Sequence, residues 1–251
     1  MFRSEMTPLL RRDVTSPLRF QLIKPTSMKS PIDPLAHFYP EAHYHVYNRT
    51  NHREPLFFTD ENRRFFLSKY QQYLGDYVDT FAWSLLENHF HFSIRIKSAK
   101  SITAVIQQIP ELDRIAAQQH FLATPEPERN FHTVVERQFT RLFTSYAMAF
   151  NQQYARSGNL FYRPFKRVAI QDDDHLVWLI YYIHANIAKH GVMSDFRQYP
   201  WSSYAAFLSD KPTHLYKTEV LNWFGGLAGF LAFHQPDKDF PEELDFLQPE
   251  D

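Results

Sequence analysis

Between residues 43 and 208, segments with the apolar spacing of β-strands alternate with segments that have the spacing of α-helices. Strict alternation of apolar and polar residues begins at 43–47 and predicts a first strand. Two apolar runs at 77–86 and 89–97 are separated by only two residues, which predicts a hairpin. A short basic run at 165–170 predicts a last strand. These four segments predict a small sheet.

Apolar residues at helical spacing lie between the predicted strands. Thr59 predicts the N-cap of a helix that stops by Gly75. The acidic residues 172–174 predict the start of a helix that runs to about Lys189, because carboxylates cap free N–H groups and complement the helix dipole. Further helical patterns lie at 101–108, at 133–154 and after Pro200.

The element order β-α-β-β-α-β-α predicts an α+β fold of the ferredoxin-like type, in which helices cover one face of an antiparallel sheet. Residues 1–36 are rich in proline, serine and basic side chains and show no period, so we predict a mobile arm there. The core domain is predicted over 37–208, with a polar, proline-containing insertion at about 98–132. A helical extension with an acidic tail is predicted over 209–251.

The composition excludes several chemistries. The chain has 251 residues and no cysteine, which excludes disulfides, thiolate metal sites and cysteine nucleophiles. It has 6 glycines and neither a G-x-x-x-x-G-K-[ST] nor a G-x-G-x-x-G motif, so a nucleotide-driven motor or a dinucleotide enzyme is not expected. No run of about 18 apolar residues occurs, and residues 1–33 have no apolar core before a small-residue cleavage site, so we do not expect them to be a secretory signal. We therefore expect a cytoplasmic protein without a membrane partner.

The formal net charge of −1 conceals segments of opposite sign. Residues 137–167 carry six arginines and lysines, no acidic residue and many aromatic residues, whereas 236–251 are predominantly acidic. Basic residues interleaved with aromatic ones are typical of a nucleic-acid-binding surface. The alternative is a solvated face whose charge is balanced elsewhere.

The strongest local motif is Asn88-His89-Phe90-His91. Residues i and i+2 of a strand point to the same face, so His89 and His91 lie about 7 Å apart along the strand and can converge on one divalent metal. A second histidine pair, His43 and His45, has the same spacing on the first predicted strand. Spacing alone does not choose between the two pairs, and structural histidines are the alternative for each.

Tyr182 and Asn186 lie four residues apart on the helix that opens at 172–174, so they share one face. Asn186 offers a neutral oxygen ligand, and Tyr182 offers a phenol. A phenol with a pKa of about 10 is a poor nucleophile at neutral pH. A divalent metal that polarises a phosphate and assists the leaving oxygen would make its attack feasible. A half-buried tyrosine beside a polar neighbour is the alternative.

At these residues the sequence resembles the single-tyrosine HUH (histidine–hydrophobe–histidine) transposases, especially the REP-associated tyrosine transposases and relatives of bacterial insertion sequences. The resemblance covers residues 39–208. The matching stretches are 44–51, 53–57, 83–92 around His89 and His91, 157–167, 182–186 with 189–191, and 201–204. Asn186 is followed by Ile187 where the family often has proline, and losing that proline predicts a straighter helix.

The resemblance implies the HUH endonuclease core and a role for each matched residue. His89 and His91 would be the metal ligands, Tyr182 the nucleophile, and Asn186 a polar group that assists the metal. His45 falls where the family usually has a histidine that is not a ligand, and His43 has no counterpart role. The implied cofactor is Mg²⁺ or Mn²⁺, which oxygen and imidazole donors favour over a thiolate-type zinc site.

The implied activity is that of a transposase: a metal-dependent single-stranded DNA endonuclease and strand transferase that acts at DNA hairpins through a covalent phosphotyrosine. We expect a bacterial, nucleoid-associated monomer or homodimer. Five residues of the basic segment are the expected DNA contacts: Arg156, Tyr162, Arg163, Lys166 and Arg167. A domesticated hairpin-binding protein without cleavage activity is one alternative. An RNA-binding ferredoxin-like protein whose sheet aromatics stack on bases is another.

Overall fold

The computed structural model describes residues 33–124, 128–236 and 238–242. Four strands form one antiparallel sheet in the order β2-β3-β1-β4. The strands are β1 (His43–Arg49), β2 (Val78–Leu85), β3 (His89–Ile96) and β4 (Lys166–Ile170). The predicted α+β class and the predicted β2–β3 hairpin are therefore confirmed.

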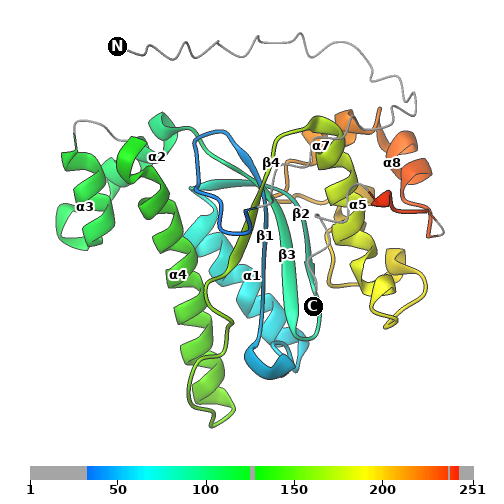
Figure 1. Cartoon of the computed structure of the whole chain (residues 1–251), viewed down its shortest axis with the longest axis horizontal. Helices are drawn as coiled ribbons and strands as arrows, with labels where there is room; N and C mark the ends of the chain where they lie inside the picture. The colour runs from blue at the N-terminus through cyan, green and yellow to red at the C-terminus, as the bar shows by residue number, and fades with distance from the viewer. Residues whose placement is uncertain (1–32, 125–127, 237, 243–251) are drawn as a thin grey trace.

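The helices follow the predicted order, with the sheet between two helical layers (Figure 1). They are α1 (Asp60–Leu74), α2 (Ala99–Gln108), α3 (Ala116–Ala123), α4 (Glu128–Gln153), α5 (Asp173–Lys189), α6 (Tyr204–Leu208), α7 (Lys217–Trp223) and α8 (Leu227–Phe233). Single 3₁₀ turns lie at Asn51–Arg53, Glu111–Asp113 and Phe196–Gln198. No helix in the described part of the chain is long and apolar enough to cross a membrane.

The pleat of β1 divides the core into two clusters. Tyr44 and Val46 face α1 and α4, where they pack with Phe92 and other aromatic residues. The alternate residues of β1 face α5, which packs on Val168 of β4 together with the C-terminal helices. Thus α1 and α4 lie on one face, as the ferredoxin-like prediction requires, but α5 and the extension cover the other face, where the prediction placed no helices.

Local capping explains where two helices begin. The hydroxyl of Thr59 accepts a hydrogen bond from Asn62 N at 3.3 Å, and the Asn62 side chain accepts one from Thr59 N at 3.2 Å. Asp172 Oδ1 accepts a hydrogen bond from Asp174 N at 2.8 Å before α5. Both starts were predicted from the sequence, because caps depend on residue type close to the helix end.

The described part of the predicted insertion belongs to the helical layer. Its α3 buries Phe121 against Phe131 of α4, which begins five residues before the predicted start at 133. Of the predicted arm, residues 1–32 lie outside the described part. The last residues of the predicted arm, 33–36, are described and contact β4, because Ala36 N donates to Arg167 O at 3.2 Å. Residues 243–251 of the acidic tail also lie outside the described part.

Candidate active site

The register of β1 and β3 places the H-x-H motif under α5. Tyr47 pairs with His91, and Arg49 pairs with His89, at one end of the sheet. The rings of His89 and His91 are 5.1 Å apart between centroids and nearly perpendicular. Both side chains are buried on the α5 face. The period of two thus placed both imidazoles on one face, as the sequence predicted.

Asn186 connects the histidines to the tyrosine of α5. Its amide Nδ2 donates a hydrogen bond to Tyr182 Oη at 2.7 Å. Its carbonyl Oδ1 faces His89 Nε2 at 3.2 Å. The ring of Tyr182 stands nearly perpendicular to His91, with 5.5 Å between centroids. The four residues predicted for catalysis and metal binding therefore meet in one buried cluster.

His45 joins this cluster, which the sequence did not reveal. Its Nε2 lies 2.9 Å from Nδ1 of His91, and its ring is 5.9 Å from that of Tyr182. His43 lies at the other end of β1, where it stacks on Phe81. Burial lowers the pKa of His45 to about 3. Burial also lowers the pKa of His91 well below its ordinary value, and the neighbouring histidines and Lys189 add to this effect.

The donor set fits a divalent ion without forming a complete protein cage. His91 Nε2 is buried and has no hydrogen-bond partner within the described residues. His89 Nε2 and the Asn186 carbonyl oxygen face each other nearby, and imidazole nitrogen and amide oxygen are both established metal donors. No group of three or more His, Cys, Asp or Glu side chains in the described part could hold a metal. Two imidazoles and one amide would leave the other coordination positions to water and substrate oxygens.

A basic cavity of about 120 Å³ opens beside His89. Arg49, Arg53, Asn88 and His190 complete its lining, and the His190 ring lies 4.9 Å from the His89 ring. Two arginines in the lining of one small cavity give it a positive charge, which is favourable for an anion such as a phosphate group. Sequence analysis missed this set, because its residues come from β1, a 3₁₀ turn, the β2–β3 loop and the end of α5.

The expected DNA-binding residues of the basic segment fall into different environments. Tyr162 is 44% exposed with the Arg49 guanidinium 5.6 Å from its ring centroid, and Arg163 is also exposed. Lys166 is half-buried. Arg156 forms a 2.7 Å ion pair with Glu54. Tyr162 and Arg163 are therefore the members most open to a ligand.

Arg167 was expected to contact DNA, but its position in the structure does not agree with this expectation. Its side chain is buried, forms a 3.1 Å ion pair with Glu136 and donates to Ala36 O at 2.8 Å. Its guanidinium also lies over the rings of Phe38 and Phe165. A buried cation needs such partners, so Arg167 joins the arm, α4 and β4 and does not face a phosphate.

A groove of about 490 Å³ separates α4 from the basic segment. Tyr162 and Arg163 form part of one wall, and Thr144 and Asn151 of α4 form part of the other. Asn48 also lines the groove, and its Oδ1 accepts a hydrogen bond from Arg49 N at 2.9 Å. Arg49 lines the basic cavity at His89, and its guanidinium lies 5.6 Å from the ring centroid of Tyr162 in the groove, so this contact connects the two.

A chain of hydrogen bonds holds α5 against the sheet. The Phe230 carbonyl can only accept, so His234 Nδ1 donates to it at 2.9 Å and His234 Nε2 accepts from His184 Nδ1 at 3.0 Å. His184 Nε2 must then accept from the Ser203 hydroxyl at 2.8 Å. Ser203 Oγ in turn accepts from Trp83 N at 2.9 Å. Every member is satisfied, so this chain ties β2, α5 and α8 together, and its His184 lies two residues after Tyr182 on α5.

The segment after α8 packs over the tyrosine. The Phe240 ring lies 6.0 Å from the Tyr182 ring, and the Tyr181 hydroxyl donates to Gln235 O at 3.1 Å. Tyr182 is only 5% exposed as a result of these contacts and those with the histidines. Tyr181 points toward this segment, whereas Tyr182 points toward the site.

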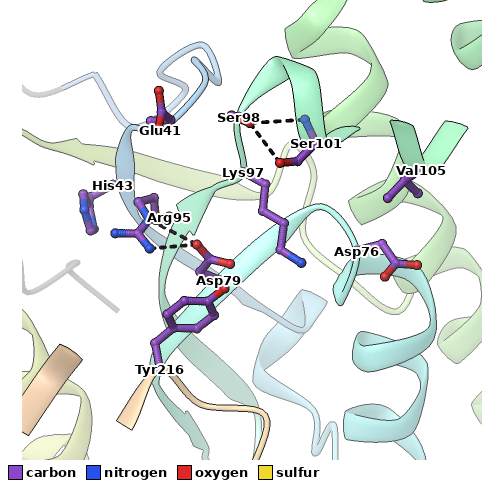
Figure 2. A pocket seen from close by; sticks show the side chains of 10 residues that line it. All are labelled: Glu41, His43, Asp76, Asp79, Arg95, Lys97, Ser98, Ser101, Val105 and Tyr216. Carbon is purple, nitrogen blue, oxygen red and sulfur yellow. Dashed lines mark hydrogen bonds and ion pairs between the residues drawn. The ribbon is translucent and has the colours of Figure 1, made fainter. Parts of the chain in front are cut away.

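A larger cavity, of about 650 Å³, lies at the end of β1 and β3 opposite to His89, and Figure 2 shows its lining residues. Arg95 in its wall is paired with Asp79 at 2.9 Å and with Glu219 at 2.7 Å. Lys97 Nζ donates to Gly75 O at 2.8 Å. These charged groups hold β2, β3 and α7 together. His43 lines this cavity, whereas His45 lies beside His91, so the structure separates the members of the second histidine pair and keeps His89 and His91 together.

Comparison with known proteins found structural similarity to a solved structure but no similarity in sequence to a known family. No family model matches the chain, and no curated protein matches its sequence. A solved structure described as the REP-associated tyrosine transposase bound to a REP hairpin is similar over 70% of this chain and 86% of that chain. The sequence identity is 14% and the TM-score is 0.43.

Proposed function

We propose that this protein is a metal-dependent single-stranded DNA endonuclease and strand transferase of the transposase type, with Tyr182 as its nucleophile. The observation that carries the proposal is the single amide of Asn186, which contacts both the Tyr182 hydroxyl and His89. A nucleophile and a metal-binding group must reach the same phosphate, and the contact of both side chains with one amide supports this pairing.

In the proposed reaction, Tyr182 Oη attacks the phosphorus of a phosphodiester and the bond from phosphorus to the 3′-oxygen breaks. The phenol proton is released, and the departing 3′-oxygen takes up one proton. The Asn186 amide orients the attacking oxygen, because it donates to Tyr182 Oη at 2.7 Å. Bound Mg²⁺ or Mn²⁺ would polarise the phosphate and stabilise the leaving oxygen. The phosphotyrosine keeps the energy of the phosphodiester, so rejoining needs no nucleotide cofactor.

The surroundings of the site support a single-stranded or hairpin DNA substrate. Arg49 and Arg53 in the small cavity provide positive charge for a phosphate beside His89. The adjoining groove presents the exposed ring of Tyr162, and stacking of an unpaired base on such a ring contributes about 1–3 kcal/mol. Duplex DNA keeps its bases stacked inside, so a ring in a groove favours unpaired nucleotides.

The test is covalent trapping on a labelled hairpin oligonucleotide with single-stranded flanks and Mn²⁺. Wild-type protein and the Tyr181→Phe variant are expected to form an adduct that survives denaturing electrophoresis, and Tyr182→Phe is expected to form none. Tyr181 is a matched control, because its hydroxyl bonds to Gln235 O on a different side of α5. An adduct with Tyr182→Phe would reject the assignment.

Hairpin binding without cleavage is a second candidate, favoured by the burial of Tyr182 beneath Phe240. Tight binding of the hairpin with no metal-dependent nicking would support it. The RNA-binding alternative needed an open sheet face for base stacking. Here α1 and α4 cover one face and α5 covers the other, so the sheet aromatics are core residues.

A further inference from the structure

His45 is a buried histidine to which the proposed function assigns no role. It lies on β1 opposite Ser93, so it is a diagonal neighbour of His91 across the strand pair. Its Nε2 is 2.9 Å from His91 Nδ1, and both rings are fully enclosed. Within the described residues His91 Nε2 has no hydrogen-bond partner. The contact with His45 is therefore the hydrogen bond that orients the His91 ring.

Only one proton fits between these two nitrogens, and the ring that carries it determines whether His91 Nε2 has an N–H or a lone pair. A neutral imidazole has one N–H and one lone pair. If His45 donates, His91 carries its proton on Nε2 and presents an N–H to the site. If His91 donates from Nδ1, its Nε2 presents a lone pair instead. Only the second arrangement leaves His91 able to bind a metal through Nε2.

We propose that His45 is a positioning residue: its Nε2 accepts the Nδ1–H of His91 and so fixes His91 in the tautomer whose Nε2 lone pair serves as the metal donor. The inference rests on the proposed function, because it assigns His91 to a divalent cation. Metal-binding histidines commonly donate their second N–H to a carboxylate, a carbonyl or water. Here a neighbouring strand supplies an imidazole for that purpose.

The packing around His91 leaves the hydrogen bond to His45 as the tautomer-specific contact. The rings of Tyr47 and Tyr182 lie 5.8 Å and 5.5 Å from the His91 ring. Ring packing limits rotation but does not distinguish Nδ1–H from Nε2–H. The hydrogen bond does distinguish them, because it couples the tautomers of the two rings. When His45 carries its proton on Nδ1, which has no hydrogen-bond partner within the described residues, its Nε2 can only accept, and it pairs with the Nδ1–H form of His91.

The direct test is ¹⁵N-histidine NMR of the full chain without metal or DNA, with the His91 signals identified from the His91→Gln variant. The two tautomers give different ¹⁵N shifts and two-bond couplings to the ring protons. We expect His91 as the Nδ1–H form, hydrogen-bonded to His45. An Nε2–H form of His91 in the wild-type protein overturns the proposal. This measurement does not depend on DNA cleavage, so a wrong tautomer and a missing cleavage activity can be told apart.

A matched pair of variants tests the consequence for metal binding. Gln at position 45 keeps an oxygen acceptor near the place of Nε2, whereas Met has a similar length and no comparable acceptor. Mn²⁺ affinity, measured by electron paramagnetic resonance without DNA, is expected to fall about 10–100-fold in His45→Met and to be largely retained in His45→Gln. Equal affinity in the two variants overturns the proposal, as does absence of Mn²⁺ binding by the wild-type protein. Circular dichroism checks that both variants are folded, and the wild-type NMR result stands even if one is not.

Discussion

Ser203 is expected to be essential to the stability of the α5 face, although it lies outside the site. Its hydroxyl is 0% exposed, accepts a hydrogen bond from Trp83 N at 2.9 Å and donates one to His184 Nε2 at 2.8 Å. Ser203→Ala removes one oxygen and leaves two buried polar groups without partners. The rest of the hydrogen-bond chain through His234 has no substitute donor for His184 Nε2.

The magnitude follows from these two groups. Each buried donor or acceptor left without a partner costs about 1–3 kcal/mol, so Ser203→Ala is expected to lower the free energy of unfolding by about 3–4 kcal/mol. For a chain of this length a loss of 1 kcal/mol lowers Tm by about 2–4 °C, which predicts a fall of roughly 10 °C. Loss of the hydroxyl volume adds little, because alanine leaves only a small void.

Ser202→Ala is the matched control. Ser202 is also buried, at 4% exposure, but its hydroxyl contacts Tyr199 O and Tyr204 N at 3.4 Å, which are long for hydrogen bonds. Its loss is expected to cost less than about 1 kcal/mol. Urea denaturation followed by circular dichroism at pH 7.5 measures both variants. Equal destabilisation by the two substitutions, or a loss below about 1 kcal/mol for Ser203→Ala, would refute the reasoning.

The remaining predictions concern pH and two arginines. Burial holds the folded-state pKa of His45, His91, His184 and His234 below the unfolded value of about 6.5, so the unfolded state binds more protons as the pH falls. The stability that these neutral histidines contribute is fully present above pH 6.5 and is lost below it, so the free energy of unfolding is expected to fall by about 5 kcal/mol between pH 7.5 and 5.5. Urea midpoints that stay constant over this range would contradict this prediction. Arg53→Ala is expected to weaken hairpin binding and to reduce the salt slope by about 1, whereas an unchanged slope in filter binding would remove Arg53 from the phosphate site. Arg167→Lys is expected to lower unfolding free energy by about 2 kcal/mol and to leave the salt slope unchanged, because the guanidinium binds Ala36 O and Glu136; a reduced slope would return it to the DNA surface.

The sequence predicted the parts of the fold that depend on neighbouring residues. Alternation located β1, and the side-chain caps at Thr59 and Asp172 located the starts of α1 and α5. The site histidines could be paired because residues i and i+2 of a strand share a face. Tyr182 and Asn186 could be paired because residues i and i+4 of a helix do, and the two side chains are hydrogen-bonded in the structure.

Features that depend on register and tertiary contact could not be predicted. His45 reaches His91 only because β1 and β3 pair with Tyr47 opposite His91, and no local pattern determines that register. Arg167 appeared in the sequence as one cation of a basic run. Its partner Glu136 lies just before that run, and only the packing of α4 on β4 brings the two side chains together.

The most direct test of the central claim is peptide mapping of the covalent DNA–protein adduct formed with Mn²⁺. After nuclease and protease digestion, mass spectrometry is expected to find the nucleotide remnant on Tyr182, through a phosphate on its phenolic oxygen. The adduct should be absent when the metal is chelated. A remnant on any other residue, or metal-dependent nicking of the hairpin without a protein adduct, would contradict the account.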